Sequence, residues 1–411
     1  MTDLVDRDRV KSPQCVILCG GLGTRLGVLT ANTPKPLLPV GGEPFLETLI
    51  FELGRQGVRD ILLLAGYQHE KIVTFAKSSP AAARFGMTLN VSVEPSPAGT
   101  GGALRHARDA LAECFLLING DTWFDIPFLS FWATYQERPS NVVGALALRH
   151  VDNAGRYGSV DLDGNVVSGF REKCSDGFAG YINGGVYFLS RQILDWISSN
   201  SSLERDVLPK LAAKGQLLGQ KFDQAYFIDI GLPETYERAQ TEIPAQKTRP
   251  AAFLDRDCVI SFDHGHVGSV ECFTFVDGAP AAIRGLNEAG CYVFVVTNQS
   301  SIGQGCDSQA DHLTLMDHIA CQLRARGAHF DEHRFYPYHS HAVTSACGAP
   351  HPWQKPPPDM LIDLINHWPV SLGRSFLIGG KATDLEAAVA VGISGHLFAG
   401  GDLAAFVSQI I

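Results

Sequence analysis

The sequence lacks the long apolar run that a membrane-spanning helix needs, and its start, Thr2-Asp3-Leu4-Val5-Asp6, is too polar for a signal peptide. It has no C-x-x-C pair among its ten cysteines, and acidic residues exceed basic ones by 43 to 33, for a net charge of −10. A negative surface argues against nucleic acid and anionic membranes as main partners. Scattered cysteines are typical of reduced thiols, so we expect a cytoplasmic protein.

A glycine-rich loop follows a short apolar segment, residues 15–18, that we expect to form a buried strand. Such a loop brings backbone N–H groups close to an anion, and a helix that starts after it would add its positive end. Arg25 and Lys35 supply cations, which favours a polyphosphate ligand. A tight strand-to-helix turn is the structural alternative, but it gives these cations no role. The loop residues expected to bind the nucleotide are Gly20, Gly21, Gly23 and Thr24.

The run Gly20-Gly21-Leu22-Gly23-Thr24-Arg25-Leu26, followed by Pro34-Lys35-Pro36, resembles the signature of the sugar-1-phosphate nucleotidyltransferases. It has neither the Gly-Lys-Ser/Thr of a P-loop nor the glycine spacing of the dinucleotide fingerprint. The resemblance covers about residues 14–240. It implies that a sugar 1-phosphate oxygen attacks the α-phosphorus of an NTP, while Mg²⁺ and the cations Arg25, Lys35 and Lys173 neutralise the phosphates.

Strand and helix patterns alternate through the first part of the chain. Residues 46–57 place large apolar side chains at helical spacing and end at Gly54 and Gly57, and the apolar run 61–65 follows as a strand. This alternation is typical of an α/β fold. We therefore expect a Rossmann-like domain with a mostly parallel mixed sheet over residues 1–243.

An alternating strand at residues 91–95 ends in a glycine turn that contains Gly99 and Thr100. In the resembled family this segment recognises the base. Guanine presents two adjacent donors, N1–H and the N2 amino group, and a carboxylate accepts both, so Glu94 favours GTP over uracil or thymine nucleotides. The structural alternative is a solvent-facing glutamate at a strand end.

Two acidic residues stand where apolar strands end, Asp121 after residues 115–118 and Asp229 after residues 227–228. The carboxyl edge of a parallel sheet is where α/β folds bind ligands, and carboxylates suit Mg²⁺. Each alone could be a turn or cap residue. Together, and in the order of the resembled family, they are expected to be its metal pair.

Further matches lie between these two acids. The resemblance implies that Gly158, Glu172 and Asn183 contact sugar hydroxyls and that Lys173 binds the sugar phosphate. From the residues alone, Glu172 could equally be an exposed ion-pair partner of Lys173.

Residues 244–250 are polar and hold two prolines, so we expect a linker there and a second domain over residues 251–411. An apolar strand ends in Asp255-Arg256-Asp257, Thr297-Asn298 follows another, and Lys355 and a Gly-x-Lys…Asp run come later. This order resembles the haloacid-dehalogenase phosphatases, in particular the heptose 1,7-bisphosphate phosphatases. The resemblance implies Asp255 as nucleophile, Asp257 as acid/base, Thr297 and Lys355 as phosphate ligands and Asn298 as a substrate contact, with Asp255, Asp257 and Asp384 around Mg²⁺.

The second domain departs from that family in two places that matter for catalysis. Cys258 replaces a glycine, and Gly380 stands where a magnesium-binding aspartate is expected, leaving Asp384. Two interpretations stay open: a weakened phosphatase in which Asp384 substitutes for the missing ligand, or a noncatalytic remnant, which we favour. We expect no zinc, because Tyr336, Tyr338, His351 and Trp353 occupy the places of the relatives' zinc loop. A zinc set from His339, His341, Cys347 and His351 fits no standard spacing.

Together the two resemblances imply an enzyme that makes GDP-D-glycero-D-manno-heptose from GTP and heptose 1-phosphate, for a surface glycan such as lipopolysaccharide. The alternatives are a mannose or other hexose 1-phosphate nucleotidyltransferase, and a noncatalytic regulatory protein that binds sugar nucleotides. The sequence leaves the anomer and the oligomeric state open, a homo-oligomer included.

Overall fold

The computed structural model describes residues 12–154, 158–171, 178–262, 269–303, 307–337 and 358–411. The chain divides into two compact units, with the boundary between Ala245 and Gln246. Within the described ranges, no helix is long and apolar enough to cross a membrane.

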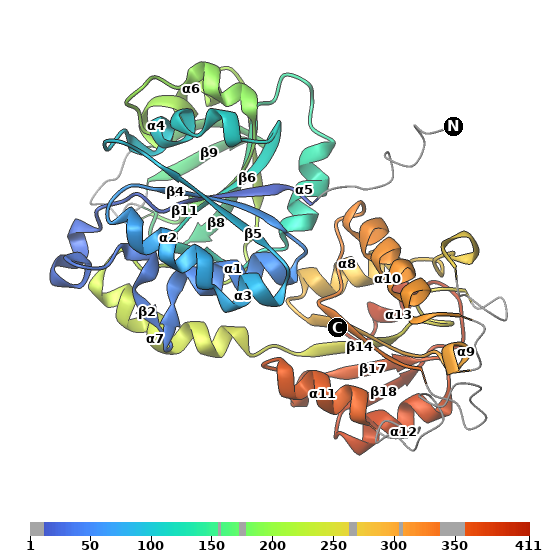
Figure 1. Ribbon diagram of the computed structural model, residues 1–411. Coiled ribbons are helices and arrows are strands. Elements are labelled where there is room, and N and C mark those ends of the chain that lie inside the picture. Colours follow the sequence, from blue (N-terminus) through green and yellow to red (C-terminus); the bar gives the residue numbers. More distant parts are fainter. Residues whose placement is uncertain (1–11, 155–157, 172–177, 263–268, 304–306, 338–357) are drawn as a thin grey trace. The chain divides into compact units, whose positions relative to one another are not determined.

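The first unit is built on a nine-stranded sheet. Its strands are β1 (Gln14–Leu18), β4 (Asp60–Ala65), β5 (Thr88–Val93), β6 (Cys114–Asn119), β8 (Gly144–Val151), β9 (Ser159–Asp163), β10 (Val166–Arg171), β11 (Gly180–Ser190) and β12 (Leu217–Lys221). Their order is β5-β4-β1-β6-β11-β8-β12-β10-β9 (Figure 1). The half β5-β4-β1-β6 is parallel, whereas β11 runs antiparallel to both β6 and β8. The expected α/β fold with a mixed sheet is confirmed, and the parallel half carries the predicted nucleotide loop.

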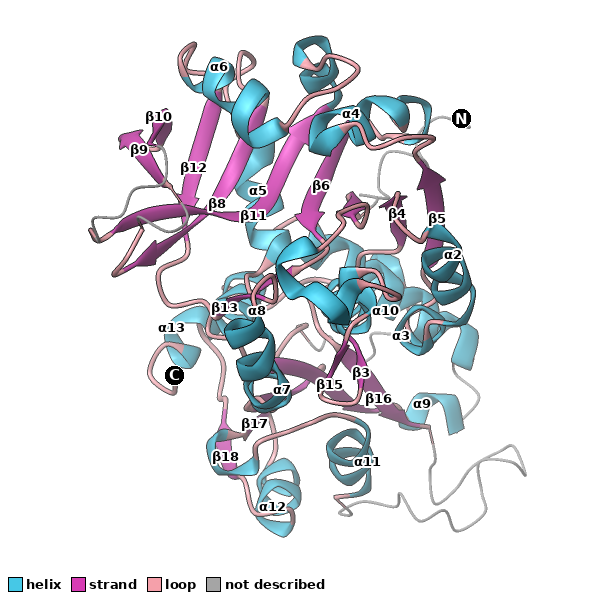
Figure 2. Cartoon of the chain, turned by 90° about the vertical axis from the view of Figure 1, so that its left-hand side faces the viewer, coloured by secondary structure: helices cyan, strands magenta, loops and turns pink. Residues whose placement is uncertain are grey.

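Helices cover both faces of this sheet. They are α1 (Phe45–Arg55), α2 (His69–Ser78), α3 (Pro80–Arg84), α4 (Gly99–His106), α5 (Phe128–Gln136), α6 (Leu208–Ala212) and α7 (Pro233–Lys247). Figure 2 shows α4 and α6 on one side of the sheet and α5 on the other. The strands supply apolar side chains to both sides: in β1, Cys15 and Ile17 join one core and Val16 joins the other. A strand buried on both faces explains the unbroken apolar runs of the sequence.

Two short antiparallel pairs complete the first unit, β2 (Pro39–Val40) with β3 (Glu43–Pro44), and β7 (Thr122–Phe124) with β13 (Phe227–Asp229). In the second pair Asp229 lies opposite Thr122. The backbone N–H of Ile230 donates to the carbonyl of Asp121 at 3.0 Å. This pairing places two acidic residues side by side although they are far apart in the sequence.

The predicted linker over residues 244–250 is wrong for its first half, because α7 continues through Pro244 to Lys247. Thr235, Ala239 and Ile243 are buried at a spacing of four residues, and the last two belong to a hydrophobic core. Burial of this face holds the helix together past the hydrogen bond that a proline removes.

The second unit is a five-stranded parallel sheet of order β16-β15-β14-β17-β18. Its strands are β14 (Ala251–Asp255), β15 (Tyr292–Asn298), β16 (Glu332–Tyr336), β17 (Phe376–Gly379) and β18 (Ser394–Leu397). Its helices are α8 (Ala279–Glu288), α9 (Ser300–Gly303), α10 (Gln309–Arg324), α11 (Asp359–His367), α12 (Ala382–Ala390) and α13 (Leu403–Val407). The predicted second α/β sheet is confirmed, and the two strands predicted before Asp255 and Thr297, β14 and β15, are neighbours in it.

Candidate active site

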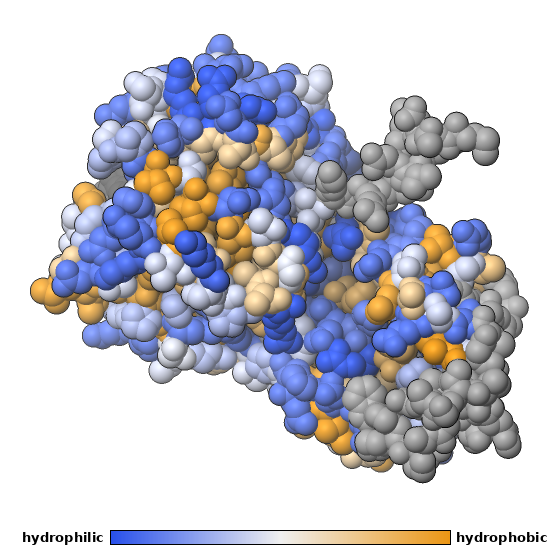
Figure 3. Space-filling model, in the orientation of Figure 1, coloured by the Kyte–Doolittle hydropathy of each residue, from blue (hydrophilic) through white to orange (hydrophobic). Residues whose placement is uncertain are grey.

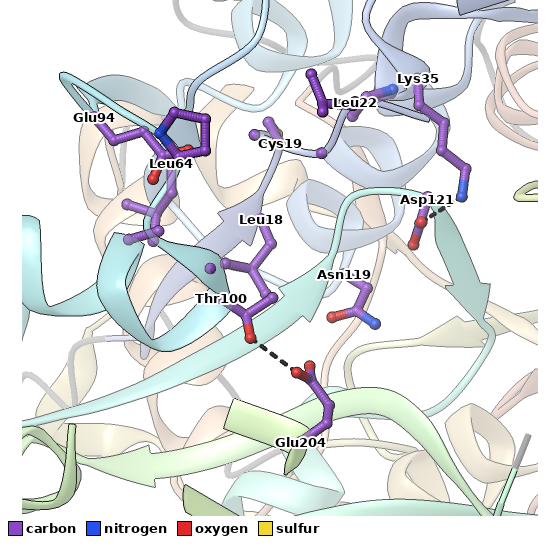
Figure 4. A pocket seen from close by; sticks show the side chains of 16 residues that line it. Leu18, Cys19, Leu22, Lys35, Leu64, Glu94, Thr100, Asn119, Asp121 and Glu204 are labelled. Carbon is purple, nitrogen blue, oxygen red and sulfur yellow. Dashed lines mark hydrogen bonds and ion pairs between the residues drawn. The ribbon is translucent and has the colours of Figure 1, made fainter. Parts of the chain in front are cut away.

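A cavity of about 320 Å³ opens in the first unit where β1, β4 and β6 end (Figure 4). Carboxyl ends of parallel strands meet at one edge of a sheet, which is where α/β folds bind ligands. The cavity brings together many of the residues predicted from the sequence. Those that line it are Gly20, Gly21, Lys35, Glu94, Gly99, Thr100 and Asp121.

Glu94 lies at one end of the cavity, just after β5. Its Oε2 accepts a hydrogen bond from the backbone N–H of Ala98 at 3.3 Å. Burial raises the pKa of its carboxyl group, against the opposing effects of this hydrogen bond and of His106. A Cβ atom on Gly66 would overlap Glu94 Oε1, and one on Gly20 would lie 3.0 Å from it. The Glu94 carboxylate therefore lies beside two glycines, and a side chain at either position would crowd it.

Lys35 lies at the other end and joins two acidic residues. Its Nζ donates to Asp121 Oδ2 at 2.5 Å and lies 3.5 Å from Asp229 Oδ1. The Lys35 side chain is only 7% exposed, so this cation is fixed in place. Pro34 and Pro36 flank it in a short 3₁₀ turn, residues 35–37, and restrict its backbone.

Arg25 approaches the same group from the glycine-rich loop. A Cβ atom on Gly231 would lie 2.5 Å from Lys35 Nζ, 2.7 Å from Asp229 Oδ1 and 3.1 Å from Arg25 Nη2. All three charged groups thus surround one glycine. The backbone N–H of Gly231 also donates to Asp229 Oδ1 at 2.6 Å, which orients that carboxylate.

Asp121 and Asp229 fit a magnesium ion by their chemistry, because both offer carboxylate oxygens to one cation, the Lys35 ammonium. Among the described residues, no group of three His, Cys, Asp or Glu side chains converges to hold a metal. At phosphate-transfer sites the protein nevertheless commonly binds Mg²⁺ through only one or two carboxylates, and substrate phosphates complete its coordination shell.

The segment after the glycine-rich loop is not the expected α-helix. Residues 24–30 form 3₁₀ turns that Gly27 interrupts with a φ of 55°. The predicted positive end of an α-helix directly after the glycine-rich loop is therefore wrong. Leu22 in the preceding loop and Val28 and Leu29 in this segment are 53%, 89% and 41% exposed. Figure 3 shows hydrophobic surface at the left edge, where Figure 1 draws this blue segment.

Two polar residues of the cavity lining escaped prediction, Asn119 and Glu204. Asn119 ends β6, two residues before Asp121, so its position at the end of a predicted strand could have identified it as a site residue. Glu204 had no such signal, because it lies in a single π-helical turn over residues 203–207. Its Oε2 accepts hydrogen bonds from Thr100 Oγ1 and Ser202 Oγ, each at 2.8 Å.

The glycine run that opens α4 makes the contact between Thr100 and Glu204 possible. A Cβ atom on Gly99 or Gly101 would lie 2.5 or 3.0 Å from the carbonyl oxygen of Ser201. The N–H of Gly101 instead donates to that oxygen at 2.9 Å. The N-terminus of α4 is thereby engaged by protein, and its glycines serve close packing.

The predicted sugar-binding residues are only partly described. Glu172 and Lys173 lie outside the described residues. Asn183 uses its Oδ1 for the N–H of Gly185 at 3.0 Å and donates from Nδ2 to Tyr187 Oη at 2.8 Å. Among the described residues, no partner is found for the second N–H of the Asn183 amide. Gly158 has a φ of 84°, which favours glycine there.

In the second unit, parallel strand ends bring predicted residues to one sheet edge, with Asp255 beside Val296 in register. Asp257 is held on both oxygens: Arg256 Nε donates to Oδ1 at 2.8 Å and Gln299 Nε2 to Oδ2 at 3.0 Å. Gln299 Nε2 also donates to the buried Thr297 Oγ1 at 2.9 Å. Asn298 Oδ1 is buried and finds no hydrogen-bond partner in the described part of the chain. Residues 338–357, which include Lys355 and the histidines and cysteine considered for zinc, lie outside the described residues.

In the described part of the second unit, no group of three His, Cys, Asp or Glu side chains that could hold a metal is found. Asp384 is buried at the start of α12, where its Oδ2 accepts the backbone N–H of Lys381 at 3.0 Å. A Cβ atom on Gly380 would lie 3.3 Å from the Cβ of Cys258, which itself has a φ of 65°. Cys258 thus occupies the space beside the position where the resembled phosphatases carry a ligand.

Comparison with known proteins finds a family that matches the first compact unit. The family described as Nucleotidyl transferase matches residues 14–246. The D-glycero-alpha-D-manno-heptose 1-phosphate guanylyltransferase of Aneurinibacillus thermoaerophilus is 36% identical over 233 residues, which are 56% of this chain and 98% of that protein. The crystal structure of HddC from Yersinia pseudotuberculosis complexed with GMP-PN aligns with a TM-score of 0.50 and 35% identity, over 56% of this chain and 100% of that one.

A second relative is of a different kind. The D-glycero-beta-D-manno-heptose-1,7-bisphosphate 7-phosphatase of Rhodopseudomonas palustris is 44% identical over 163 residues, which are 40% of this chain and 91% of that protein. The chain therefore belongs to the nucleotidyl transferase family and also contains a stretch related to heptose bisphosphate phosphatases.

Proposed function

We propose that the first unit transfers a guanylyl group from GTP to D-glycero-D-manno-heptose 1-phosphate and releases pyrophosphate. The observation that carries this proposal is the layout of one cavity, with Glu94 at one end and Lys35 between Asp121 and Asp229 at the other. The first end suits a base with two adjacent donors. The second suits phosphates that must be positioned and neutralised.

In the proposed reaction an oxygen of the sugar 1-phosphate attacks the α-phosphorus of GTP, and the bond from that phosphorus to the bridging oxygen of pyrophosphate breaks. The attacking oxygen is already anionic, so no general base is required. Lys35 and Arg25 hold the phosphates in line and reduce their repulsion. Gly158 and Asn183, with Glu172 and Lys173, are proposed to position the sugar phosphate.

Asp121 and Asp229 are the residues proposed to hold Mg²⁺, which would neutralise charge on the reacting phosphates. Lys35 orients both carboxylates. Removal of the metal with a chelator should therefore abolish pyrophosphate release, and added Mg²⁺ should restore it.

The sugar is proposed from the relatives, whose names differ in one detail. The guanylyltransferases are named for the alpha anomer and the phosphatase for the beta anomer. Because 36% identity spans nearly all of the guanylyltransferase, we propose the alpha 1-phosphate as the substrate of transfer. Two consecutive reactions in one chain would need a single anomer, so both should be tested.

A pyrophosphate-release assay tests the function directly. It combines GTP, ATP, UTP or dTTP with heptose 1-phosphate of either anomer, mannose 1-phosphate or glucose 1-phosphate. We expect the highest kcat/KM with GTP and the alpha heptose 1-phosphate. Higher activity with mannose 1-phosphate would favour the hexose enzyme. Activity with UTP or dTTP but not GTP would contradict the role of Glu94, and no release with any pair would leave a noncatalytic binding protein.

For the second unit we propose a noncatalytic remnant of a phosphatase. Gly380 supplies no carboxylate, both oxygens of Asp257 are engaged, and Asp384 caps α12. Phosphate release from heptose 1,7-bisphosphate should then be absent. Mg²⁺-dependent release that disappears in Asp255→Asn would contradict this proposal.

A further inference from the structure

Glu204 is a carboxylate in a cavity that the proposed function assigns to anionic ligands. Hydroxyls of Thr100 and Ser202 bind its Oε2, and no described residue donates to its Oε1. No described Lys, Arg or His side chain forms an ion pair with it. A negative charge here would repel a phosphate, so the ligand group that Glu204 suits is a donor.

Asn119 offers a second open acceptor in the same cavity. Its Oδ1 is buried and has no hydrogen-bond partner among the described residues. Gly185 has a φ of 72°, and a Cβ atom there would lie 2.7 Å from Asn119 Nδ2, so a glycine makes room for this amide. A buried acceptor without a donor is costly, which points to a ligand that supplies the donor.

The position of these two acceptors in the cavity indicates which part of a ligand they would contact. In the view of Figure 4, Asn119, Thr100 and Glu204 lie below Glu94 at the left and the Lys35–Asp121 pair at the right, and from left to right they lie between the two. The part of a nucleotide between its base and its phosphates is a sugar ring with neighbouring hydroxyls. The sugar of the second substrate carries the same kind of hydroxyls.

We propose that Glu204 Oε1 and Asn119 Oδ1 bind neighbouring ring hydroxyls, with Thr100 and Ser202 orienting the Glu204 carboxylate. This inference rests on the proposed function and adds specificity residues to its site. The shared chemistry is a vicinal diol, which belongs either to the ribose of the nucleotide or to the sugar 1-phosphate.

The test compares each substrate with the analogue that lacks one hydroxyl. Calorimetric titration in Mg²⁺ measures the Kd of GTP and dGTP, and steady-state assays give kcat/KM for the sugar 1-phosphate and its 2-deoxy counterpart. In the wild-type protein we expect a preference of about tenfold or more for the hydroxyl in one pair, the gain typical of a hydrogen bond to a charged group. In Glu204→Ala that preference should fall to about threefold or less, and the affected pair identifies the ring.

Two further variants keep the result interpretable. Glu204→Gln retains the side-chain shape and should reduce the same preference to a smaller extent. Glu137→Gln makes the same chemical change on an exposed side chain and should leave both preferences unchanged. The inference is overturned if the wild type discriminates in neither pair, or if Glu204→Ala keeps its full preference. A wild-type protein that binds no GTP overturns the proposed function itself, and this inference with it, before any variant is compared.

Discussion

Glycines decide the geometry of the candidate site because they let charged groups approach the backbone. Gly66 and Gly20 border Glu94, and Gly231 borders Lys35, Asp229 and Arg25. At Gly66 and Gly231 any side chain would overlap a group that the proposed function uses. Their importance follows from contact distances and not from their own chemistry.

Gly66→Ala should impair base selection. The added methyl group would overlap Glu94 Oε1 and push the carboxylate from its place. We expect the GTP Kd to rise about tenfold, with a smaller change for ATP, because one charged hydrogen-bond acceptor is displaced. Parallel titrations with both nucleotides check this, and an equal change for both would show that Gly66 acts on the fold instead.

Cys258 and Gly380 should be coupled in the second unit. The two Cβ positions would be 3.3 Å apart, closer than the roughly 3.5–4.0 Å of comfortable carbon contact. Gly380→Asp alone is therefore expected to be crowded, whereas Gly380→Asp with Cys258→Gly should gain more Mg²⁺-dependent phosphatase activity. The Cys258→Gly change also relieves a left-handed backbone. Equal activity of the single and double variants would contradict the coupling.

At the scale of elements, the ends of strands position the reactive groups. Asp229 ends β13 and is aligned with Thr122 at the start of β7, so a two-stranded pairing fixes the distance between the proposed metal ligands. The next turn, at Gly231, must stay narrow to let Lys35 and Arg25 approach.

Gly231→Ala should lower kcat by about tenfold to a hundredfold while the protein remains folded. A Cβ atom there would lie within 3.1 Å of three charged groups, and misplaced charges lose much of their effect on a phosphate-transfer transition state. Pyrophosphate release together with circular dichroism checks this. Gly373→Ala is a suitable control, because a Cβ atom there meets nothing within 4 Å.

Ser308 should stabilise the second unit by capping α10. Its Oγ accepts the N–H of Asp311 at 3.1 Å, and Asp311 Oδ2 accepts the N–H of Ser308 at 3.0 Å. Ser308→Ala should lower the free energy of unfolding by about 1 kcal/mol in urea denaturation. Hydrogen bonds from Ser308 lower the pKa of the Asp311 carboxyl group. The stabilisation that this carboxylate adds is therefore present near neutral pH and is lost as the pH falls through that lowered pKa. An unchanged unfolding midpoint would contradict the capping role.

At the scale of the whole molecule, two α/β units carry separate sets of catalytic candidates, and the chain is acidic although its proposed substrates are anions. Salt screens the field of the net charge of −10 beyond about 8 Å at physiological ionic strength. The cations Lys35 and Arg25 act at contact distance. Local charge therefore outweighs net charge at this site.

The separation of the two sets predicts separate effects of inactivation. Asp121→Asn should reduce nucleotidyl transfer by at least about a hundredfold, because a proposed metal ligand is lost. Asp255→Asn should leave nucleotidyl transfer unchanged, since Asp255 belongs to the other unit. Pyrophosphate release by the two full-length variants checks this, and a large loss in Asp255→Asn would show that the second unit contributes to transfer.

The sequence by itself determined the α/β class, most central strands and the residues of the cavity that belong to contiguous motifs. Apolar runs, glycine turns and strand-end acids are local signals, and Gly20, Glu94 and Asp121 can be read from their immediate neighbours. Sequence reasoning failed at residues 24–30, where Gly27 interrupts the expected helix, and at 244–247, where buried contacts extend α7 through a proline.

Only the tertiary structure decided which distant residues share the site. Thr100 and Glu204 are 104 positions apart, and their hydrogen bond exists because the α4 glycines pack against Ser201. The same holds for Gly66 beside Glu94 and for Gly231 among three charges. The physical reason is that these contacts depend on strand order and on close backbone approach, and neither leaves a pattern in the neighbouring sequence.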